Sequence, residues 1–438
     1  MPRVDSKQAL ISFGLRTILE RGAVVDRRQF LTGGAAGLVG VAGGVLVSRG
    51  QSDADRDDPG SGIAVPFRGE RQAGIANAAP RYATFAAFDI VERDGASMAS
   101  LMDSWTEVAD QLSVGTPISG DTGEATGMGP AGLTVTVGFG ETLFDDRCAP
   151  ASAKPAELVS LPEFPGDQLD PAWNGGDVLV QVCSEDPTVV SHAVRQLRRV
   201  GQGRARLRWS QAGFLPQASG ETPRNLFGQV DGTANPAEGS AELDDLVWVT
   251  DGPSWMVGGT YLATRRIRMM LTMWDRMGLG VQEASTGRDR GTGAPLSGGD
   301  EFTPLDLDAV HNGEPVIASD AHVRIAKTAG PGMLRRGYSF DNGPRHVGAA
   351  SDTDVPDDLD HAEHAQNDHS SMMAAMDDHD AGLFFAAFVR DPVEQFIPMQ
   401  QALSESDALG HFLAYTSAGL WAVPAGAPTG SIAAELFA

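Results

Sequence analysis

The chain has little lysine, little cysteine and no long apolar run. Of its 33 basic residues only three are lysines, and 58 acidic residues give a formal net charge of -25. Such an acidic chain is a poor partner for nucleic acids or anionic membrane surfaces, because both repel it. Hydrophobic residues still make up 42% of the 438 residues, which is enough for a large core and excludes global disorder.

The two cysteines, Cys148 and Cys183, are too few for a four-cysteine zinc site or for the disulfide framework of a small secreted domain. Cys183 ends an apolar run that begins at Asp177, and this position favours a buried thiol in the core. A disulfide between the two cysteines stays open at this point, because their spacing does not decide it.

The first sixty residues have the pattern of an export signal. Residues 26–31, Asp-Arg-Arg-Gln-Phe-Leu, precede a Gly- and Ala-rich apolar run over 32–47. A paired arginine before such a run is typical of the twin-arginine route, which exports folded proteins, many of them with a bound cofactor. The run is shorter than the ~20 apolar residues of a membrane span. We therefore expect an extracellular, periplasmic or cell-surface protein, and we leave cleavage of the signal open.

The rest of the chain predicts two α+β units. In the first unit the elements follow the order β-α-β-β-α-β of a ferredoxin-like domain. Its expected elements are strands at 82–91, 133–139, 177–183 and 205–211, and helices at 96–112 and 186–200.

The second unit is similar but less regular. Its expected elements are strands at 246–249, 259–268, 382–389 and 419–423, and helices at 269–277 and 391–403. The predicted fold class is α+β, with two ferredoxin-like domains, antiparallel sheets and peripheral helices. We place the signal and linker at 1–60, the N-terminal domain at 61–240 and the C-terminal domain at 241–438.

A segment rich in aspartate, histidine and methionine interrupts the second unit at 351–380. It holds four of the nine histidines: His361, His364, His369 and His379. Acidic runs are usually solvated, which favours a surface insertion. Imidazoles three residues apart with thioethers nearby also suit copper, so copper binding by residues 361–379 is the alternative.

Two segments carry candidate chemistry. Gly228, Asp231 and Gly232 form a Gly-x-x-Asp-Gly motif, in which the glycines let the backbone turn tightly and present a carboxylate. Taken alone, the motif also suits an Asp-Gly hairpin turn. The second segment holds His322 and, further on, Arg335 in a Leu-Arg-Arg-Gly-Tyr sequence. A lone histidine can be structural, and paired arginines can be a surface feature.

In combination, these motifs resemble the dye-decolourising peroxidases, in particular the exported branch that includes the deferrochelatase/peroxidases. The resemblance runs from about Gln72 to the C-terminus. It implies paired ferredoxin-like domains that bind haem b on the side of the second domain. It rests on segments that occur in the family's order: residues 227–233, 258–262, 287–296, 320–324 and 334–338.

The resemblance gives His322 the role of proximal iron ligand, bound through a neutral imidazole nitrogen. The other ring nitrogen should donate to an acceptor that strengthens the ligand. The candidate acceptor is Asp391, which follows the expected strand 382–389. The alternative role of Asp391 is to cap the helix that begins at Pro392.

The same resemblance makes Asp231 the distal acid–base group and Arg335 the fixed positive charge that assists cleavage of the peroxide bond. Arg288 becomes the expected partner of a haem propionate. Gly228 and Gly232 are expected to lie beside the cofactor.

The implied activity is reduction of hydrogen peroxide with electrons from bulky or phenolic donors. Two alternatives stay open: release of iron from haem in iron acquisition, and non-catalytic metal binding. Relatives often form dimers or larger assemblies, so a homo-oligomer is a further expectation. The tryptophans and tyrosines are candidate electron relays at the surface, although core positions are the simpler expectation. The tyrosines are Tyr82, Tyr261, Tyr338 and Tyr415.

Overall fold

The computed structural model describes residues 62–215, 221–344 and 379–438. Its main strands pair in the order β5-β11-β2-β3-β1-β4-β9-β10-β8, and β5 also pairs with β10. These strands are β1 (Tyr82–Ile90), β2 (Thr134–Gly140), β3 (Val178–Ser184), β4 (Ala205–Phe214), β5 (Thr260–Met269), β8 (Leu334–Arg335), β9 (Tyr338–Pro344), β10 (His379–Val389) and β11 (Leu413–Val423). A separate two-stranded sheet pairs β6 (Val310–His311) with β7 (Glu314–Pro315).

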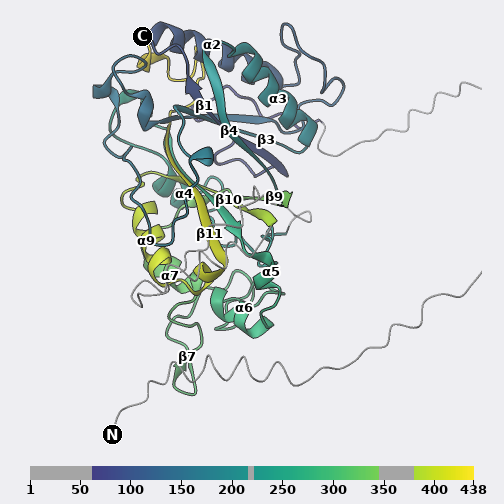
Figure 1. The fold of residues 1–438 in the computed structure, drawn as a ribbon, viewed down its shortest axis with the longest axis vertical. Helices are drawn as coiled ribbons and strands as arrows, with labels where there is room; N and C mark the ends of the chain where they lie inside the picture. Colours follow the sequence, from purple (N-terminus) through teal and green to yellow (C-terminus); the bar gives the residue numbers. More distant parts are fainter. Residues whose placement is uncertain (1–61, 216–220, 345–378) are drawn as a thin grey trace, which may run out of the picture. The chain divides into compact units, whose positions relative to one another are not determined.

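The first half of the sheet has the antiparallel order β2-β3-β1-β4 of a ferredoxin-like domain. Two helices, α2 (Gly95–Ser113) and α3 (Pro187–Val200), pack on this half (Figure 1). Each helix begins at an aspartate whose carboxylate accepts backbone N–H groups of the first turn, Asp94 for α2 and Asp186 for α3. The predicted order of the N-terminal domain is therefore confirmed.

The second half repeats this order as β9-β10-β5-β11. Its helices are α4 (Ala241–Val247), α5 (Leu271–Trp274), α6 (Leu279–Thr286), α7 (His322–Thr328) and α9 (Phe396–Ser406). In both halves the first strand lies between the third and the fourth. The prediction of two ferredoxin-like domains is thus confirmed, while the exact boundaries at 60 and 240 stay predictions.

Two short strand pairings connect the two halves of the sheet. β4 meets β9 at the single pair Phe214–Ser339, and β11 meets β2 at two pairs. Together with the β5–β10 pairing, these two pairings close eight strands into a ring. Side chains from both halves pack inside it; Phe85 of β1 stacks on Phe384 of β10 with ring centroids 4.3 Å apart.

Several predictions for the second half were wrong. Residues 246–249 do not form a strand, because Ser240 caps α4 by accepting from the Leu243 N–H, and helix geometry then buries Leu243 and Val247 one turn apart. The predicted helix 269–277 is reduced to α5, since Met269 still belongs to β5. The predicted helix 391–403 starts later, at Phe396. β9 was not expected as a strand.

The buried residues agree with the simpler expectations. Cys148 and Cys183 are both free and buried, so the open question of a disulfide between them is settled. Three tyrosines are buried: Tyr261, Tyr338 and Tyr415. No helix among the described residues is long and apolar enough to cross a membrane. The expected export signal lies outside the described residues, as does the insertion up to residue 378.

Candidate active site

His322 is the first residue of α7, and its ring is held by a buried carboxylate. Its Nδ1 lies 2.7 Å from Oδ2 of Asp407, whose side chain is 1% exposed. Asp407 ends α9 and also accepts from the Leu409 N–H, so backbone on both sides fixes it. Because a carboxylate only accepts, Nδ1 is the donor, and the Nε2 lone pair is left free. Within the described residues Nε2 has no hydrogen-bond partner.

The surroundings of His322 shift its pKa in opposite directions. Burial lowers the pKa of His322, but the charge of Asp407 and the hydrogen bond to it outweigh burial, so the pKa is raised. Arg335 lowers the pKa of His322 further and Asp231 raises it. Both groups therefore lie close enough to the ring for their charges to act on it. The structure thus places Asp231 and Arg335 within electrostatic reach of His322.

Asp231 and Arg335 form an ion pair, with Nη1 of Arg335 3.2 Å from Oδ1 of Asp231. Each side chain is 29% exposed, so solvent reaches part of the pair. The loop that carries Asp231 turns at Gly228, with φ +75°, and at Gly232, with φ +136°. These are backbone conformations that favour glycine. The glycines therefore shape the loop, and contact between them and a cofactor stays a prediction.

Asn235 joins the Asp231 loop to Arg335. Its Oδ1 accepts from the Arg335 N–H at 3.0 Å, and its Nδ2 donates to the Arg335 carbonyl at 2.8 Å. One side-chain amide thus satisfies both polar groups of a backbone residue one hundred positions away. Asn235 was not expected as a site residue from the sequence, although it lies four residues after Asp231.

Arg288 lies near Arg335. Burial and the positive charge of Arg335 lower the pKa of Arg288, while Glu301 raises it. Nη1 of Arg288 donates to the carbonyls of Gly293 and Glu301 at 2.6 and 3.0 Å. Within the described residues, Nη2 and Nε of Arg288 have no acceptor. These donors fit an anionic group such as a propionate, and that contact stays a prediction.

Asp391 does not hold His322, and this assignment is corrected. Its Oδ1 accepts from the N–H groups of Val393 and Glu394, at 2.8 and 3.2 Å, so it caps the turn that follows β10. The residue that holds the imidazole is Asp407. Both aspartates precede helical turns, and the sequence carries no local signal that tells which one reaches His322.

An aromatic cluster connects the two sides of the site. Phe227, just before the Gly-x-x-Asp-Gly motif, stacks on Trp274 with centroids 4.3 Å apart. Trp274 meets Phe412 edge to face at 5.0 Å, and Phe412 ends the short 3-10 helix that follows Asp407. Trp274 Nε1 also donates to the Phe227 carbonyl. Pairs of this kind contribute about 0.5–1.5 kcal/mol each beyond burial, so the cluster holds both segments in place.

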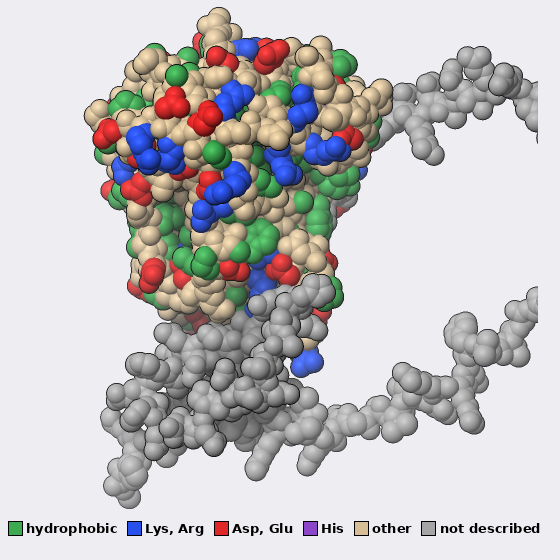
Figure 2. Space-filling view, turned by 45° about the horizontal axis from the view of Figure 1, so that its top comes forward, with side chains coloured by type: hydrophobic (Ala, Val, Ile, Leu, Met, Phe, Trp, Pro, Cys, Tyr) green, Lys and Arg blue, Asp and Glu red, His purple; other side chains and the backbone are tan. Residues whose placement is uncertain are grey.

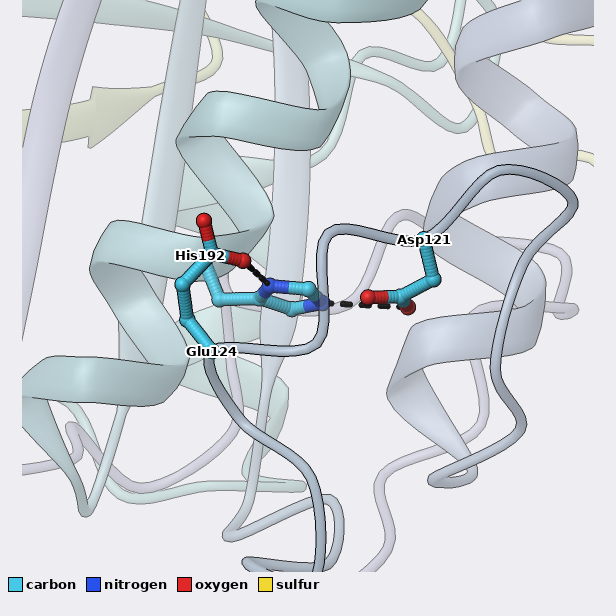
Figure 3. Close-up of side chains that lie close together, drawn as sticks. All are labelled: Asp121, Glu124 and His192. Atoms are coloured by element: carbon cyan, nitrogen blue, oxygen red, sulfur yellow. Dashed lines mark hydrogen bonds and ion pairs between the residues drawn. The ribbon is translucent and has the colours of Figure 1, made fainter.

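A second group of ionisable residues lies elsewhere, on α3 and the loop before β2 (Figure 3). His192 has one carboxylate at each ring nitrogen: Glu124 is 2.9 Å from Nδ1 and Asp121 is 3.3 Å from Nε2. Hydrogen bonds from Thr122 and His192 lower the pKa of Glu124 to about 2. Glu124 is also paired with Arg195. The imidazole ring of His192 separates the two carboxylates, and Arg195 already neutralises Glu124. The group therefore fits a set of hydrogen bonds that fixes the loop before β2 on α3 better than it fits a metal centre.

Comparison with known proteins identifies the family of the chain. The sequence profile of the N-terminal domain of Dyp-type peroxidases matches residues 72–215, and that of the C-terminal domain matches residues 222–428. The dye-decolorizing peroxidase of Thermobifida fusca is 37% identical over 437 residues, covering 91% of this chain and 94% of the relative. A deferrochelatase of Escherichia coli O6:K15:H31 is 35% identical and covers 74% of this chain and 82% of the relative.

Solved structures show the same likeness. Ferric DtpA from Streptomyces lividans superposes with a TM-score of 0.77 at 35% identity, covering 86% of this chain and 98% of that chain. A DyP-type peroxidase from Cellulomonas bogoriensis gives a TM-score of 0.75 at 37% identity, covering 86% and 99%. The chain belongs to the Dyp-type peroxidase family. It is a haem peroxidase, and haem is its cofactor.

Proposed function

We propose that His322 binds the haem iron through Nε2, that Asp231 is the acid–base group and that Arg335 stabilises negative charge on the peroxide. The observation that carries this proposal is the free Nε2 of a histidine held by a buried carboxylate, within electrostatic reach of a partly exposed Asp–Arg pair. Bound haem supplies the two-electron reduction of hydrogen peroxide and then accepts single electrons from a donor. The protein supplies the ligand, the proton transfer and the charge.

Each residue has a separate task. Asp407 accepts from Nδ1 of His322, which fixes the ring and strengthens Nε2 as a ligand. A carboxylate oxygen of Asp231 takes the proton from one peroxide oxygen and gives it to the other, which leaves as water. The Arg335 guanidinium stays charged throughout and stabilises the negative charge that develops as the O–O bond breaks. Asp231 then ends each turnover in the protonation state in which it began.

Three variants test these roles. His322→Ala should lose the Soret band of the purified protein, and a normal spectrum would refute the ligand assignment. Asp231→Asn and Arg335→Leu should keep the Soret band but react with one equivalent of peroxide at least about a hundredfold more slowly, as for loss of an acid–base or charge-stabilising group. Wild-type kinetics in both variants would refute the distal roles. Asp391→Asn is the matched control, because this carboxylate caps a turn away from His322.

For the electron donor, we propose bulky or phenolic molecules. The names of the dye-decolorizing relatives support this class. The deferrochelatase relatives favour a second candidate activity, release of iron from haem. The two activities differ in their products: an iron release activity leaves iron-free porphyrin, whose fluorescence is easily measured. Porphyrin formation without peroxide-dependent oxidation of a phenol would favour the second candidate.

We also propose export by the twin-arginine route, on the basis of Arg27 and Arg28 before the apolar run. Replacing both arginines by lysine should keep the protein in the cytoplasm, and export of this variant would refute the route. Copper binding by residues 361–379 and a homo-oligomeric state are further proposals. Deletion of residues 360–378 should abolish copper binding in calorimetry if the first is correct, and light scattering of the purified protein tests the second.

A further inference from the structure

An arginine-rich cavity lies on the N-terminal half, where α3 ends and β4 begins. Its volume is about 630 Å³, and none of its lining residues belongs to the His322 site. Four arginines line it: Arg195, Arg198, Arg199 and Arg206. Figure 2 shows several groups of basic side chains on the face that includes this half of the molecule. The hollow is large enough for a small organic ligand, one side of which would stay open to solvent.

The arginines around the cavity are more numerous than the carboxylates that pair with them. Six arginines lie between positions 195 and 208, with no acidic residue among them. Asp89 is shared by Arg206 and Arg208, at 3.1 and 3.2 Å. Among the described residues, three of the six have no carboxylate partner: Arg198, Arg199 and Arg204. A local positive charge therefore persists on a chain whose net charge is -25.

One wall of the cavity is apolar. Leu207 and Ala205 of β4 line it together with Phe88 of β1. Val91, just beyond the end of β1, also lines it, and its side chain is 55% exposed and so accessible to a ligand. Guanidinium groups beside an apolar wall suit a ligand with one anionic end and one flat apolar body.

Stabilisation of a helix end does not explain the whole cluster. Arg198 and Arg199 lie in the last turn of α3, where positive charge interacts favourably with the helix dipole. Arg206 lies on β4 and also lines the cavity, outside the reach of that effect, and its guanidinium pairs with Asp89. The arginines therefore share the cavity, and a helix terminus alone does not account for them.

We propose that this cavity binds a small aromatic carboxylate. Its carboxylate is held by Arg198 with Arg206 or Arg199, and its ring lies against Val91 and Leu207. Binding involves no covalent step and does not depend on the haem or on the proposed roles of the distal residues. The site is thus a second ligand site of the peroxidase, separate from the peroxide site.

Calorimetry of the haem-loaded protein with naphthoate, without peroxide, tests the proposal. We expect one site per chain, with affinity at least about tenfold weaker in Arg198→Gln/Arg206→Gln, as expected for lost charge-assisted hydrogen bonds. Arg147→Gln is the control, because Arg147 is similarly exposed (65% against 73% for Arg206) and also pairs with an aspartate. This control should bind naphthoate like the wild type.

Two further measurements separate this site from general charge attraction. Naphthalenemethanol, which has the ring but no charge, and acetate, which has the charge but no ring, should both bind at least about tenfold more weakly than naphthoate. Val91→Asp adds a carboxylate at an exposed position and should also abolish binding. The proposal would be overturned if Arg147→Gln lost as much affinity for naphthoate as the double variant, or if naphthalenemethanol bound as tightly as naphthoate. Tighter binding of an oligoglutamate peptide than of naphthoate would also overturn it.

Discussion

Asn235 offers a sharp test of how the site is held together. In Asn235→Ala, the Arg335 N–H and carbonyl lose the two hydrogen bonds that tie them to the Asp231 loop. Each such bond contributes about 0.5–1.5 kcal/mol net, so the placement of Arg335 loses roughly 1–3 kcal/mol. At about 1.4 kcal/mol per factor of ten, the fraction of molecules with Arg335 in place falls by roughly 5- to 150-fold at most.

The assay is the absorbance change of the haem-loaded protein after mixing with one equivalent of peroxide. We expect the rate of this change to fall within that range in Asn235→Ala, while the Soret band stays normal because His322 and Asp407 are untouched. The rate in Asn235→Asp should lie between the rates of the wild type and of Asn235→Ala, because a carboxylate still accepts from the Arg335 N–H but cannot donate to the Arg335 carbonyl.

Asn174→Ala is the matched control. The Asn174 amide makes the same two kinds of backbone bond, donating to the Asp170 carbonyl at 3.0 Å and accepting from the Ala418 N–H at 2.9 Å, far from Arg335 in sequence and outside its contacts. Loss of these two bonds in Asn174→Ala should lower the free energy of unfolding by about the 1–3 kcal/mol expected for the two Asn235 bonds. It should leave the rate of reaction with peroxide unchanged. A wild-type rate in Asn235→Ala, or an equal slowing in Asn174→Ala, would refute the reasoning.

Further predictions concern charges that the structure buries. Asp407→Asn should weaken haem binding by about 10- to 100-fold in a titration, whereas Asp391→Asn should leave it unchanged; equal effects would contradict the assignment of the imidazole partner. Asp167→Ala leaves the guanidinium of Arg265, which is 0% exposed, without its carboxylate, and should lower the free energy of unfolding by about 3–5 kcal/mol in urea. A loss below 1 kcal/mol would show that water reaches this charge. Burial raises the pKa of Asp380, but hydrogen bonds from a buried arginine of β5 outweigh it and lower the pKa. The stability that this carboxylate contributes is therefore present above about pH 4 and lost as the pH falls further, and Asp380→Asn should remove that part of the acid dependence of unfolding.

The sequence predicts the N-terminal half of the fold well because its signals are local. Asp94 and Asp186 cap their helices, β2 alternates threonine with apolar residues, and β3 is a short, mostly apolar run. The second half lacks such signals. β9 ends in Asp-Asn-Gly-Pro, a composition typical of turns, and it becomes a strand because β10 pairs with it. Tertiary pairing there outweighs local preference.

The site shows the same division between local and long-range information. His322, Asp231 and Arg335 are singled out by several motifs that together resemble one family, and in the structure Asp231 and Arg335 form an ion pair. Asp407 is 85 residues from His322 and follows Ser-Glu-Ser, a sequence that indicates a helix end and nothing more. Its role depends on α9 packing against α7, which only the folded chain shows.

The aromatic cluster explains why such distant segments keep one geometry. Phe227 leads into the loop of Asp231, and Phe412 closes the turn that begins after Asp407, so Trp274 between them contacts the supports of both groups. A shift of either segment would separate stacked rings and break the bond from Trp274 to the Phe227 carbonyl. The distance between His322 and Asp231 is therefore set by core packing as much as by the polar residues. The placement of the polar groups in this haem peroxidase thus depends also on the packing of these aromatic side chains.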